Sequence, residues 1–348
     1  MSATDLNVLI ATDEDEDDWN AFVESSNKSE IYHYYGWRHL FESVFGHNCY
    51  YLIARDDMSQ VRGLLPLVYL KSRIFGRFLV SAPCFNYCGI LANTPDVGTA
   101  LIERASTLAS ELGTSHVELR HRADVTCDLP ARRDKVSMRL TLPDSEDELW
   151  GGFTSKLRAQ IRRPQKEGAT CEEGGMELLD AFYAVFSRNM RDLGTPVFPR
   201  GMFVEICDRF SDRVRVFVVR LNGEPVAAGY TLGHRNMLEI PSASSLREFN
   251  RYSPNMFLYW SVLQYAIRQG YKIFDFGRTS KDSGPYRFKK QWGAVPQDLA
   301  WHYILKEGDE LPRINPDNPK YRLAVNIWRH LPMPIANILG PQVVKHLP

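Results

Sequence analysis

Apolar residues recur along the chain in two patterns, one typical of strands and the other of helices. The strand pattern begins with the runs Tyr50–Arg55 and Val61–Lys71, which are rich in residues that favour strands. The polar segment Asp56–Gln60 separates these runs, so the three segments together predict a β-hairpin.

The second half of the chain carries a similar hairpin. The runs Val214–Leu221 and Pro225–Leu232 flank Asn222-Gly223, and an Asn-Gly pair between apolar runs is typical of a two-residue hairpin turn. A third strand is expected at Met237–Ala243.

A long helix is predicted after each hairpin. Thr94-Pro95 and Ser253-Pro254 are typical helix starts, since a hydroxyl caps the first amides and proline suits the first helical position. Apolar residues at helical spacing support both helices: Leu101, Ala105, Leu108 and Leu112 in the first, and Leu258, Val262, Tyr265 and Ala266 in the second. Gly113 and Gly270 are expected to end them.

A buried strand is expected after each helix, at His116–Arg120 and at Lys272–Phe276. The two helix starts, Thr94 and Ser253, lie 159 positions apart, and the strands are offset by almost the same number. This offset indicates a duplicated α/β module. A coincidence between two ordinary α+β domains is the alternative.

The sequence therefore predicts two α/β (α+β) domains in tandem, each a mixed, mostly antiparallel sheet flanked by helices. Their expected ranges are residues 1–150 and 151–310, with a proline-rich tail of short helical pieces at residues 311–348. Trp150–Lys166 is predicted to form a basic helix that bridges the halves. Leu331–Pro348 is apolar and is expected to dock on the first domain, with contact to a membrane surface as the alternative.

Composition excludes two broad classes of protein. The 348 residues include 42 Lys and Arg and 42 Asp and Glu, which argues against a uniformly basic nucleic-acid-binding protein and against an acidic disordered chain. No DNA partner is expected. The sequence shows neither a signal-peptide pattern nor a run of about 18 apolar residues, so no transmembrane segment is expected. Six scattered cysteines without a CxxC pair favour reduced thiols in the cytoplasm and no metal site.

The segment Phe274–Gly293, FDFGRTSKDSGPYRFKKQWG, concentrates basic and aromatic residues just after a predicted strand. Binding sites in open α/β sheets lie at such strand ends. A solvated basic loop is the alternative, although such a loop needs no aromatic side chains. The residues expected to bind a substrate here are Arg278, Tyr286, Arg287, Lys289, Lys290 and Trp292.

Two further clusters are candidates for binding. One is the basic stretch within Trp150–Lys166, which contains Lys156, Arg158, Arg162, Arg163 and Lys166. Its simpler interpretation is a solvated helix face. The other is Asn189–Pro196, NMRDLGTP, in which Asn189 and Arg191 either line a binding cleft or cap the preceding helix.

These segments resemble the signature stretches of FemAB-like proteins that accompany exosortase (PEP-CTERM) systems, within the superfamily that has the GNAT acyltransferase fold. The matching stretches occur in order and cover nearly all of residues 30–305: Ser72–Ile90, Lys135–Leu140, Ser155–Gly168, Asn189–Phe198, Pro254–Leu263 and Phe274–Gly293. The resemblance implies two GNAT-like domains around a cleft and the transfer of an acyl or aminoacyl group to an amine.

The sequence departs from these relatives at two places. Fem peptidyltransferases carry a coiled-coil arm, and no sustained heptad run occurs here. Acetyl-CoA enzymes of this fold place a glycine-rich loop before the long helix, where this chain has Arg247–Tyr252 without glycine. Arg247 and Arg251 are still able to meet a phosphate. No bound cofactor is expected, and the donor cosubstrate is either an aminoacyl-tRNA or an acyl-CoA.

Aminolysis of an activated ester needs a positioned neutral amine and a stabilised oxyanion rather than a nucleophilic side chain. No GxSxG or Cys-His context occurs in the sequence. Asp275 is the candidate base for the amine proton, and an ion pair with Arg278 is its alternative role. Arg247, Asn255 and the loop from Arg278 to Lys290 are expected to line the donor site of the second domain.

The sequence thus predicts a cytoplasmic FemAB-like transferase in cell-envelope or exopolysaccharide metabolism. Its acceptor is expected to be a small or lipid-linked amine, transfer RNA is the possible carrier of the donor, and peripheral membrane contact is compatible with this function. An acyl-CoA-dependent N-acyltransferase acting on an amino sugar is the alternative. A catalytically inert protein that retains the fold is the third hypothesis.

Overall fold

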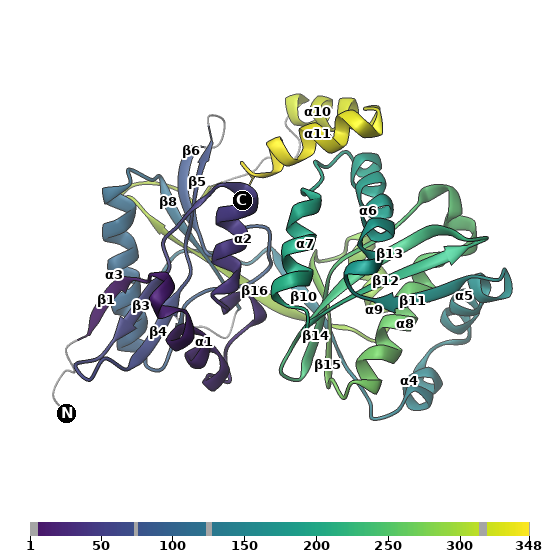
Figure 1. The fold of residues 1–348 in the computed structure, drawn as a ribbon, viewed down its shortest axis with the longest axis horizontal. Coiled ribbons are helices and arrows are strands. Elements are labelled where there is room, and N and C mark those ends of the chain that lie inside the picture. Colours follow the sequence, from purple (N-terminus) through teal and green to yellow (C-terminus); the bar gives the residue numbers. More distant parts are fainter. Residues whose placement is uncertain (1–5, 73–75, 123–126, 313–318, 348) are drawn as a thin grey trace. The chain divides into compact units, whose positions relative to one another are not determined.

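The computed structural model describes residues 6–72, 76–122, 127–312 and 319–347, and the chain forms two compact units (Figure 1). The first unit comprises Met1–Lys135, Asp298–Arg313 and Lys345–Pro348, and the second comprises Val136–Gln297 and Ile314–Val344. The first break thus falls at Lys135, before the expected position at residue 150. The units also interleave, because strand β16 (Val295–Leu305) begins in the second unit and ends in the first.

The first unit contains two groups of paired strands, in the orders β1-β3-β4-β7 and β16-β8-β6-β5-β2, with β9 beside β16. The strand bounds are β1 (Asn7–Ile10), β2 (Asn48–Cys49), β3 (Leu52–Arg55), β4 (Val61–Leu65), β5 (Val68–Ser72), β6 (Gly76–Val80), β7 (Leu91–Ala92), β8 (His116–Arg122) and β9 (Ala131–Arg132). The helices described in this unit are α1 (Glu16–Ser25), α2 (Gly36–Phe45) and α3 (Pro95–Glu111), with 3₁₀ turns at Asp13–Asp15 and Ile31–His33.

The hairpin expected in the first unit forms, but its second strand is divided. Strands β3 and β4 pair antiparallel, which confirms the hairpin. The run Val61–Lys71 is interrupted at Pro66, after which β5 pairs with β6 in the other group of strands. Proline cannot donate the amide hydrogen that a continuous strand needs, so the chain leaves the first ladder at this residue.

Helix α3 begins at Pro95 and is followed by Gly113, as predicted. Gly113 has a φ of 63°, a left-handed conformation that favours glycine after a helix. The hydroxyl of Thr94 makes no capping hydrogen bond, so proline is the part of the start signal that the structure confirms. The buried face of α3 packs against β3 and β8 in the core of this unit and consists of Val97, Leu101, Ala105 and Leu108.

The strands of the second unit have the order β11-β12-β13-β14-β15-β10. Their bounds are β10 (Lys135–Thr141), β11 (Thr170–Gly174), β12 (Val214–Leu221), β13 (Glu224–His234), β14 (Met237–Ser245) and β15 (Ile273–Ser280). Strands β11 to β14 pair antiparallel, whereas β14 and β15 are parallel. Asn222 and Gly223 have φ values of 53° and 82°, which confirms the two-residue turn between β12 and β13.

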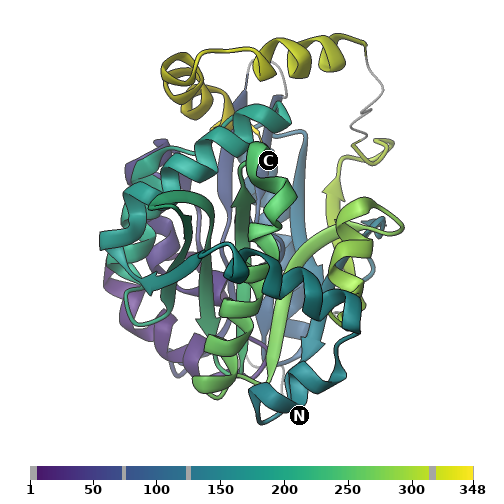
Figure 2. The same cartoon turned by 90° about the vertical axis from the view of Figure 1, so that its right-hand side faces the viewer.

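Helices cover both faces of this sheet. Those described are α4 (Glu146–Gly152), α5 (Ser155–Lys166), α6 (Leu179–Leu193), α7 (Arg200–Arg209), α8 (Pro254–Arg268), α9 (Gly284–Lys290), α10 (Pro319–Arg329) and α11 (Met333–Val344). Phe217 of β12 contacts Tyr265 of α8, with ring centroids 5.5 Å apart. On the other face, Tyr230 of β13 contacts Phe182 of α6 and Phe203 of α7. Figure 2 shows α5 and α8 on the side toward the viewer.

The predicted bridging helix at Trp150–Lys166 is wrong in two respects. The segment is divided between α4 and α5, because Thr154 has an extended backbone and its hydroxyl accepts a hydrogen bond from the amide of Leu157, which begins a new helix. Both helices also belong to the second unit, where Leu149, Leu157 and Ile161 pack into the core.

The tail forms the two helices α10 and α11, which pack against α6 of the second unit, so the expected docking on the first domain is wrong for these helices. The last residues of the tail, Lys345–Pro348, belong to the first unit. The contacts of the two helices are close: a side chain at Gly194 would collide with Val325 of α10, and one at Gly340 of α11 would collide with Val197. Only glycine fits at these points. No helix within the described ranges is long and apolar enough to cross a membrane.

We expect Gly340→Ala to weaken the packing of α11. An added Cβ would lie 2.8 Å and 3.0 Å from the backbone nitrogen and oxygen of Val197, which cannot rotate away as a side chain can. The free energy of unfolding, measured with urea, should fall by about 1–3 kcal/mol. The matched control is Gly201→Ala in α7, where a Cβ meets no atom within 4 Å. Equal effects of the two substitutions would contradict the packing described.

Candidate functional site

Strands β14 and β15 run side by side for a short distance and then separate. Their parallel ladder consists of three residue pairs and ends at Glu239 and Asp275, although β14 continues to Ser245 and β15 to Ser280. We call the region beyond the last pair the fork. Since the strands are parallel, both carboxyl ends lie on its open side, the position at which open α/β sheets hold ligands.

Pro241 marks the place where the strands separate. Tyr230 of β13 pairs with Ser242, and Leu232 pairs with Glu239, so β14 has one more residue than β13 between these pairs. Such a bulge bends a strand, and proline has no amide hydrogen to donate to a neighbouring strand. Strand β14 therefore bends at the residue where its pairing with β15 has just ended.

Asp275, the last paired residue of β15, is completely buried and ties β15 to β10. Its Oδ1 accepts hydrogen bonds from the hydroxyl of Ser137, at 2.5 Å, and from the amide of Gly277, at 2.8 Å. Its Oδ2 accepts from Nε of Arg139 at 2.9 Å. A carboxylate that is enclosed and bound in this way anchors the strands, so we propose a positioning role for Asp275 in place of the expected base.

Gly277 follows this anchor in a conformation that only glycine adopts easily, with a φ of 77°. The turn presents the carbonyl oxygens of Gly277 and Arg278 to Lys289, whose Nζ donates to them at 2.8 and 3.1 Å. Lys289 comes from α9, the short helix after β15, and its side chain is 7% exposed. The strand end and the helix are thus joined by one buried ammonium group.

Burial lowers the pKa of Lys289 to about 8, while the nearby carboxylates of Asp275 and Glu239 act in the opposite direction. Glu239 is itself buried, so the ammonium group lies near two buried acids at the base of the fork. An ammonium group has three donors, and two are bound to carbonyl oxygens. The third has no acceptor among the residues that the structure describes.

The rest of the predicted basic loop is divided between surface and core. Arg278, Arg287 and Lys290 are exposed, so the structure brings three cations to the surface beside Lys289. The loop itself contains α9, whose first turn is capped by the hydroxyl of Ser283. These three cations are accessible from solvent, and their binding of an anionic group stays a prediction.

The two aromatic residues of the segment lie elsewhere than expected. Trp292 is 1% exposed and packs against Phe153 and Tyr259 in the core of the second unit. Tyr286 is half-buried and packs against the edge of the same core. The aromatic side chains of this segment therefore hold α9 on the core, and we do not propose substrate contact for Trp292.

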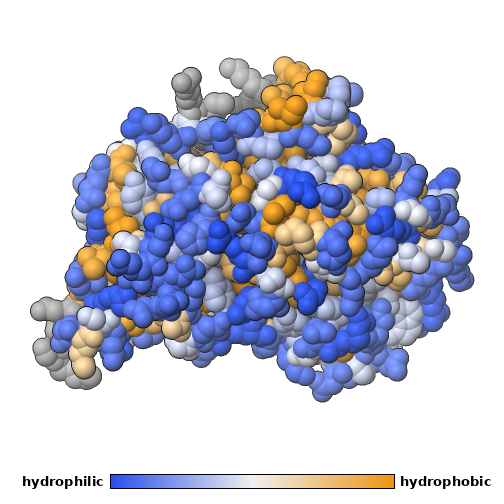
Figure 3. Space-filling view, in the orientation of Figure 1, coloured by the Kyte–Doolittle hydropathy of each residue, from blue (hydrophilic) through white to orange (hydrophobic). Residues whose placement is uncertain are grey.

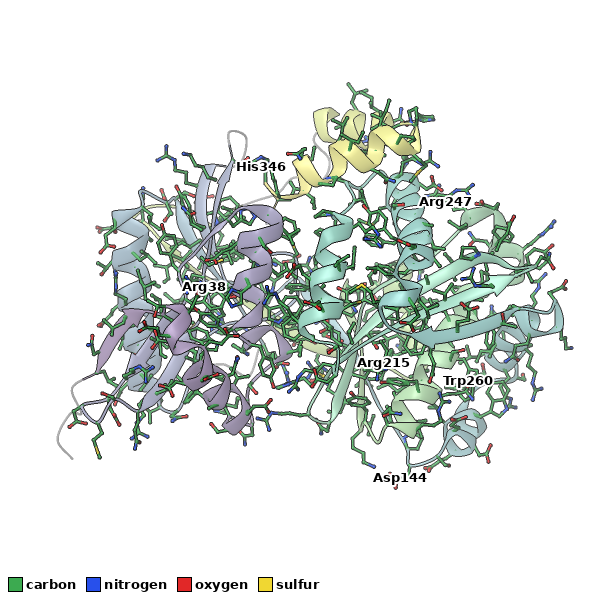
Figure 4. The ribbon with its side chains drawn as sticks, viewed as in Figure 1. Arg38, Asp144, Arg215, Arg247, Trp260 and His346 are labelled. Carbon is green, nitrogen blue, oxygen red and sulfur yellow. The ribbon has the colours of Figure 1, made fainter. Side chains whose placement is uncertain are left out.

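Of the remaining candidate residues, Asn189 of α6 contacts the carboxyl-terminal part of β14. Nδ2 of Asn189 donates to the hydroxyl of Ser244 at 3.1 Å, so Asn189 contacts β14 within the fork. Asn255, the second residue of α8, is half-buried. Arg247 donates to the backbone oxygen of Asp192 at the end of α6 (Figure 4).

Arg191 does not reach the fork through any contact that the structure describes. Its Nε donates to Asp192 at 2.7 Å, and its Nη1 donates to the backbone oxygen of Leu331, between α10 and α11, at 3.1 Å. Arg191 therefore fixes the tail on α6, a role that neither the cleft nor the helix-capping interpretation of the sequence included.

Two positioning residues, Ser137 and Arg139 of β10, were missed as site residues. Both are polar positions two residues apart in KVSMRL, where polar and apolar residues alternate, so they share one face of a strand. A polar pair at this spacing on a buried strand indicates a buried polar partner. The sequence gives no sign that this partner is Asp275, which is more than 130 residues away.

One group in the first unit has the composition of a metal site. The ligand atoms of His121, Cys127 and His302 lie within 4.8 Å of one another. However, Nε2 of His121 accepts a hydrogen bond from the amide of Ile90, so the ring proton is on Nδ1, which faces Nδ1 of His302 at 3.0 Å. Metal-binding histidines usually donate from their second nitrogen. Burial also lowers the pKa of His121 to about 3, and the pair is best described as two neutral histidines.

Comparison with known proteins supports the fold. Residues 155–290 match the family model of the acetyltransferase (GNAT) domain, and no curated protein sequence matches the chain. Among solved structures, FemX is 16% identical with a TM-score of 0.64, covering 84% of this chain and 96% of that one.

Two other solved structures are similar over comparable lengths. L-PGS from Bacillus licheniformis is 14% identical with a TM-score of 0.58, covering 93% of this chain and 99% of that chain. A tandem GNAT protein from the clavulanic acid biosynthesis pathway is 13% identical with a TM-score of 0.55, covering 88% and 100%. At such low identity the likeness shows the fold alone, and it confirms the expected tandem GNAT-type architecture.

We expect Asp275→Asn to destabilise the protein by about 3–5 kcal/mol, because it removes the buried carboxylate that pairs with the partly buried guanidinium of Arg139. Urea unfolding followed by fluorescence measures this loss. The control is Asp282→Asn on the exposed turn before α9, which should change the free energy of unfolding by less than about 0.5 kcal/mol. An Asp275→Asn protein of unchanged stability would contradict the anchoring role and restore the carboxylate as a candidate base.

Proposed function

We propose that the chain transfers an aminoacyl or acyl group from an activated ester to an amine acceptor, at the fork of the second unit. The observation that carries this proposal is the parting of β14 and β15 beside the buried ammonium group of Lys289. Beyond Glu239 and Asp275 the two strands no longer pair, so their facing edges can hold an extended donor through backbone hydrogen bonds. The family match over residues 155–290 supports the same reaction class.

In the proposed reaction, the amine nitrogen of the acceptor attacks the carbonyl carbon of the donor ester. The new C–N bond forms as negative charge develops on the carbonyl oxygen, and the third hydrogen of the Lys289 ammonium group stabilises this charge. The ester C–O bond then breaks. The amine proton is transferred, through water, to the departing oxygen, so no group of the enzyme is consumed.

Helix α5 favours an aminoacyl-tRNA as the donor. It carries five cations, Lys156, Arg158, Arg162, Arg163 and Lys166, and no acidic residue. None of the five forms an ion pair with a described residue; Arg162 lies over the ring of Trp150 instead, 5.0 Å from its centroid. A helix face with this charge suits a chain of phosphates.

Acyl-CoA is the alternative donor. In that case the chain would be an acyl-CoA-dependent N-acyltransferase that acts on an amino sugar. The segment before α8, where a pyrophosphate would be held in this fold, is a 3₁₀ helix at Arg247–Tyr252 without glycine. Its backbone amides are less accessible than those of a glycine-rich loop. The absence of glycine therefore argues against acyl-CoA as the donor. The side chains of Arg247 and Arg251 remain candidate phosphate ligands.

The acceptor is proposed to be an amine of the cell envelope or of an exopolysaccharide precursor, a class that rests on the resemblance to exosortase-associated FemAB-like proteins. The exposed cations Arg278, Arg287 and Lys290 suit a phosphate or carboxylate on such an acceptor. Asn189, Tyr286 and Asn255 offer neutral hydrogen-bonding groups in the same unit.

The donor is tested by incubating the protein separately with radiolabelled aminoacyl-tRNAs and with acyl-CoAs, each with a mixture of amines. We expect accelerated transfer from the tRNA ester, with binding that weakens steeply as salt rises. The double variant Arg162→Glu/Arg163→Glu should weaken tRNA binding about tenfold or more. The matched control reverses two exposed cations of the first unit, Lys28 and Arg77, and should bind as the wild type does. Transfer only from thioesters would establish the alternative, and no transfer from either donor would favour the inert protein.

The role of Lys289 is tested by a pH profile against Lys289→Met, which has a similar length and no charge. Because the ammonium form is required and its pKa is about 8, the ratio of wild-type to variant rate should be large at pH 7 and decline as the pH rises above 8. At pH 7 we expect a ratio of about 100 or more. A ratio that rises with pH would identify Lys289 as the base instead, and a ratio near one throughout would contradict any role in the reaction.

A further inference from the structure

Helices α10 and α11 present an apolar surface that the rest of the second unit does not cover. Half of the large apolar side chains that are exposed in the described residues come from these two helices. They are Leu323, Ile327, Ile335, Ile338, Leu339 and Val343. Ile338 is 70% exposed and Leu323 is 60% exposed, and Figure 3 shows apolar atoms gathered over these helices.

This exposed surface is separate from the one that docks the helices on α6. Ala336, Gly340 and Val344 recur every four residues along α11 and are buried, so they form the inner stripe. The exposed residues of α11 lie on another side of the helix and contribute little to the internal packing. An apolar stripe that the fold itself does not need, and that water must otherwise solvate, indicates an external partner.

The charge of this region selects the partner. Residues 319–347 contain four Lys or Arg and no Asp or Glu. Arg322 and Arg329 are exposed on α10, beside Leu323 and Ile327. Two copies of the chain that met through this surface would bring these cations together, which is unfavourable. An apolar stripe flanked by cations, with Trp328 at the end of α10, is instead typical of a helix that lies in the interface of an anionic bilayer.

We propose that α10 and α11 dock the protein on an anionic lipid surface. The two helices are fixed to the same end of α6 that lies beside the fork. Arg191 of α6 binds the backbone oxygen of Leu331, and Arg247, just after β14, binds the backbone oxygen of Asp192. Docking would therefore turn the open side of the fork toward the membrane. Given the proposed function, this placement assigns a lipid-linked amine as the acceptor class.

The test measures co-sedimentation of the full chain with vesicles of phosphatidylcholine, with and without about 30 mol% phosphatidylglycerol, at about 0.1 M salt. We expect binding to the anionic vesicles to be about tenfold tighter than to the neutral ones. The variant Leu323→Glu/Ile338→Glu should bind about tenfold more weakly than the wild type, because it places two carboxylates in the interface. Met58→Glu, at a 75% exposed position of the first unit, is the matched control and should bind as the wild type does.

Three outcomes would overturn the proposal: no binding of the wild type to either vesicle, equal binding of wild type and double variant, or equal binding to neutral and anionic vesicles. A dimer that the double variant dissociates, without vesicle binding, would assign the surface to a second copy of the chain. Unchanged thermal unfolding of the variants shows that their folds are intact. Transfer to a soluble amine, measured without vesicles, is independent of docking, so failure of the docking leaves the proposed reaction testable on its own.

Discussion

The carboxylate of Asp275 is the point on which the geometry of the second unit depends. It is buried and accepts hydrogen bonds from a guanidinium, a hydroxyl and a backbone amide. These bonds fix β15 against β10 and stabilise the turn at Gly277. That turn directs two carbonyl oxygens toward Lys289, which holds α9 against the strand end. A buried charge is costly unless it is fully paired, so these contacts are mutually dependent. The base of the fork is stable because all of them are made together.

The position of the fork follows from the same physics. Three pairs hold β14 to β15, and the ladder ends just before the bulge that contains Pro241. The unit thus leaves strand edges open beside a buried cation, a combination that stabilises negative charge developing on a carbonyl oxygen. The cationic face of α5 and the apolar stripe of α10 and α11 lie on the surface and require no change in this core. The proposed donor and membrane contacts can therefore be tested separately from the proposed reaction.

Much of the fold could be predicted from the sequence, because its signals are local. The turn at Asn222-Gly223 and the helix starts at Pro95 and Pro254 depend on residues that restrict the backbone by themselves. The break at Lys135 could not be predicted, because the return of β16 to the first unit depends on pairing between distant residues. The same lack of long-range information explains why a bridging helix was wrongly expected at Trp150–Lys166.

The sequence predicted that polar groups gather at the end of β15, because strand ends in α/β sheets commonly do so, and the structure places Lys289 and three exposed cations there. The roles of the individual residues in this site could not be predicted from the sequence. In the sequence, Asp275, Lys289 and Trp292 all look like candidate binding residues. In the structure, burial makes Asp275 an anchor, Lys289 a cation of lowered pKa and Trp292 a core residue. Burial is a property of the whole unit and cannot be read from a segment of 20 residues.

The central claim is that the donor is held between the open edges of β14 and β15. Hydrogen exchange measures this directly when the protein is mixed with an aminoacyl-tRNA analogue in which a stable amide replaces the ester. The account predicts slower exchange at the amides of Ala243–Ser245 and Phe276–Ser280 when the analogue is bound. Unchanged exchange in both segments, with slower exchange confined to another part of the chain, would contradict it.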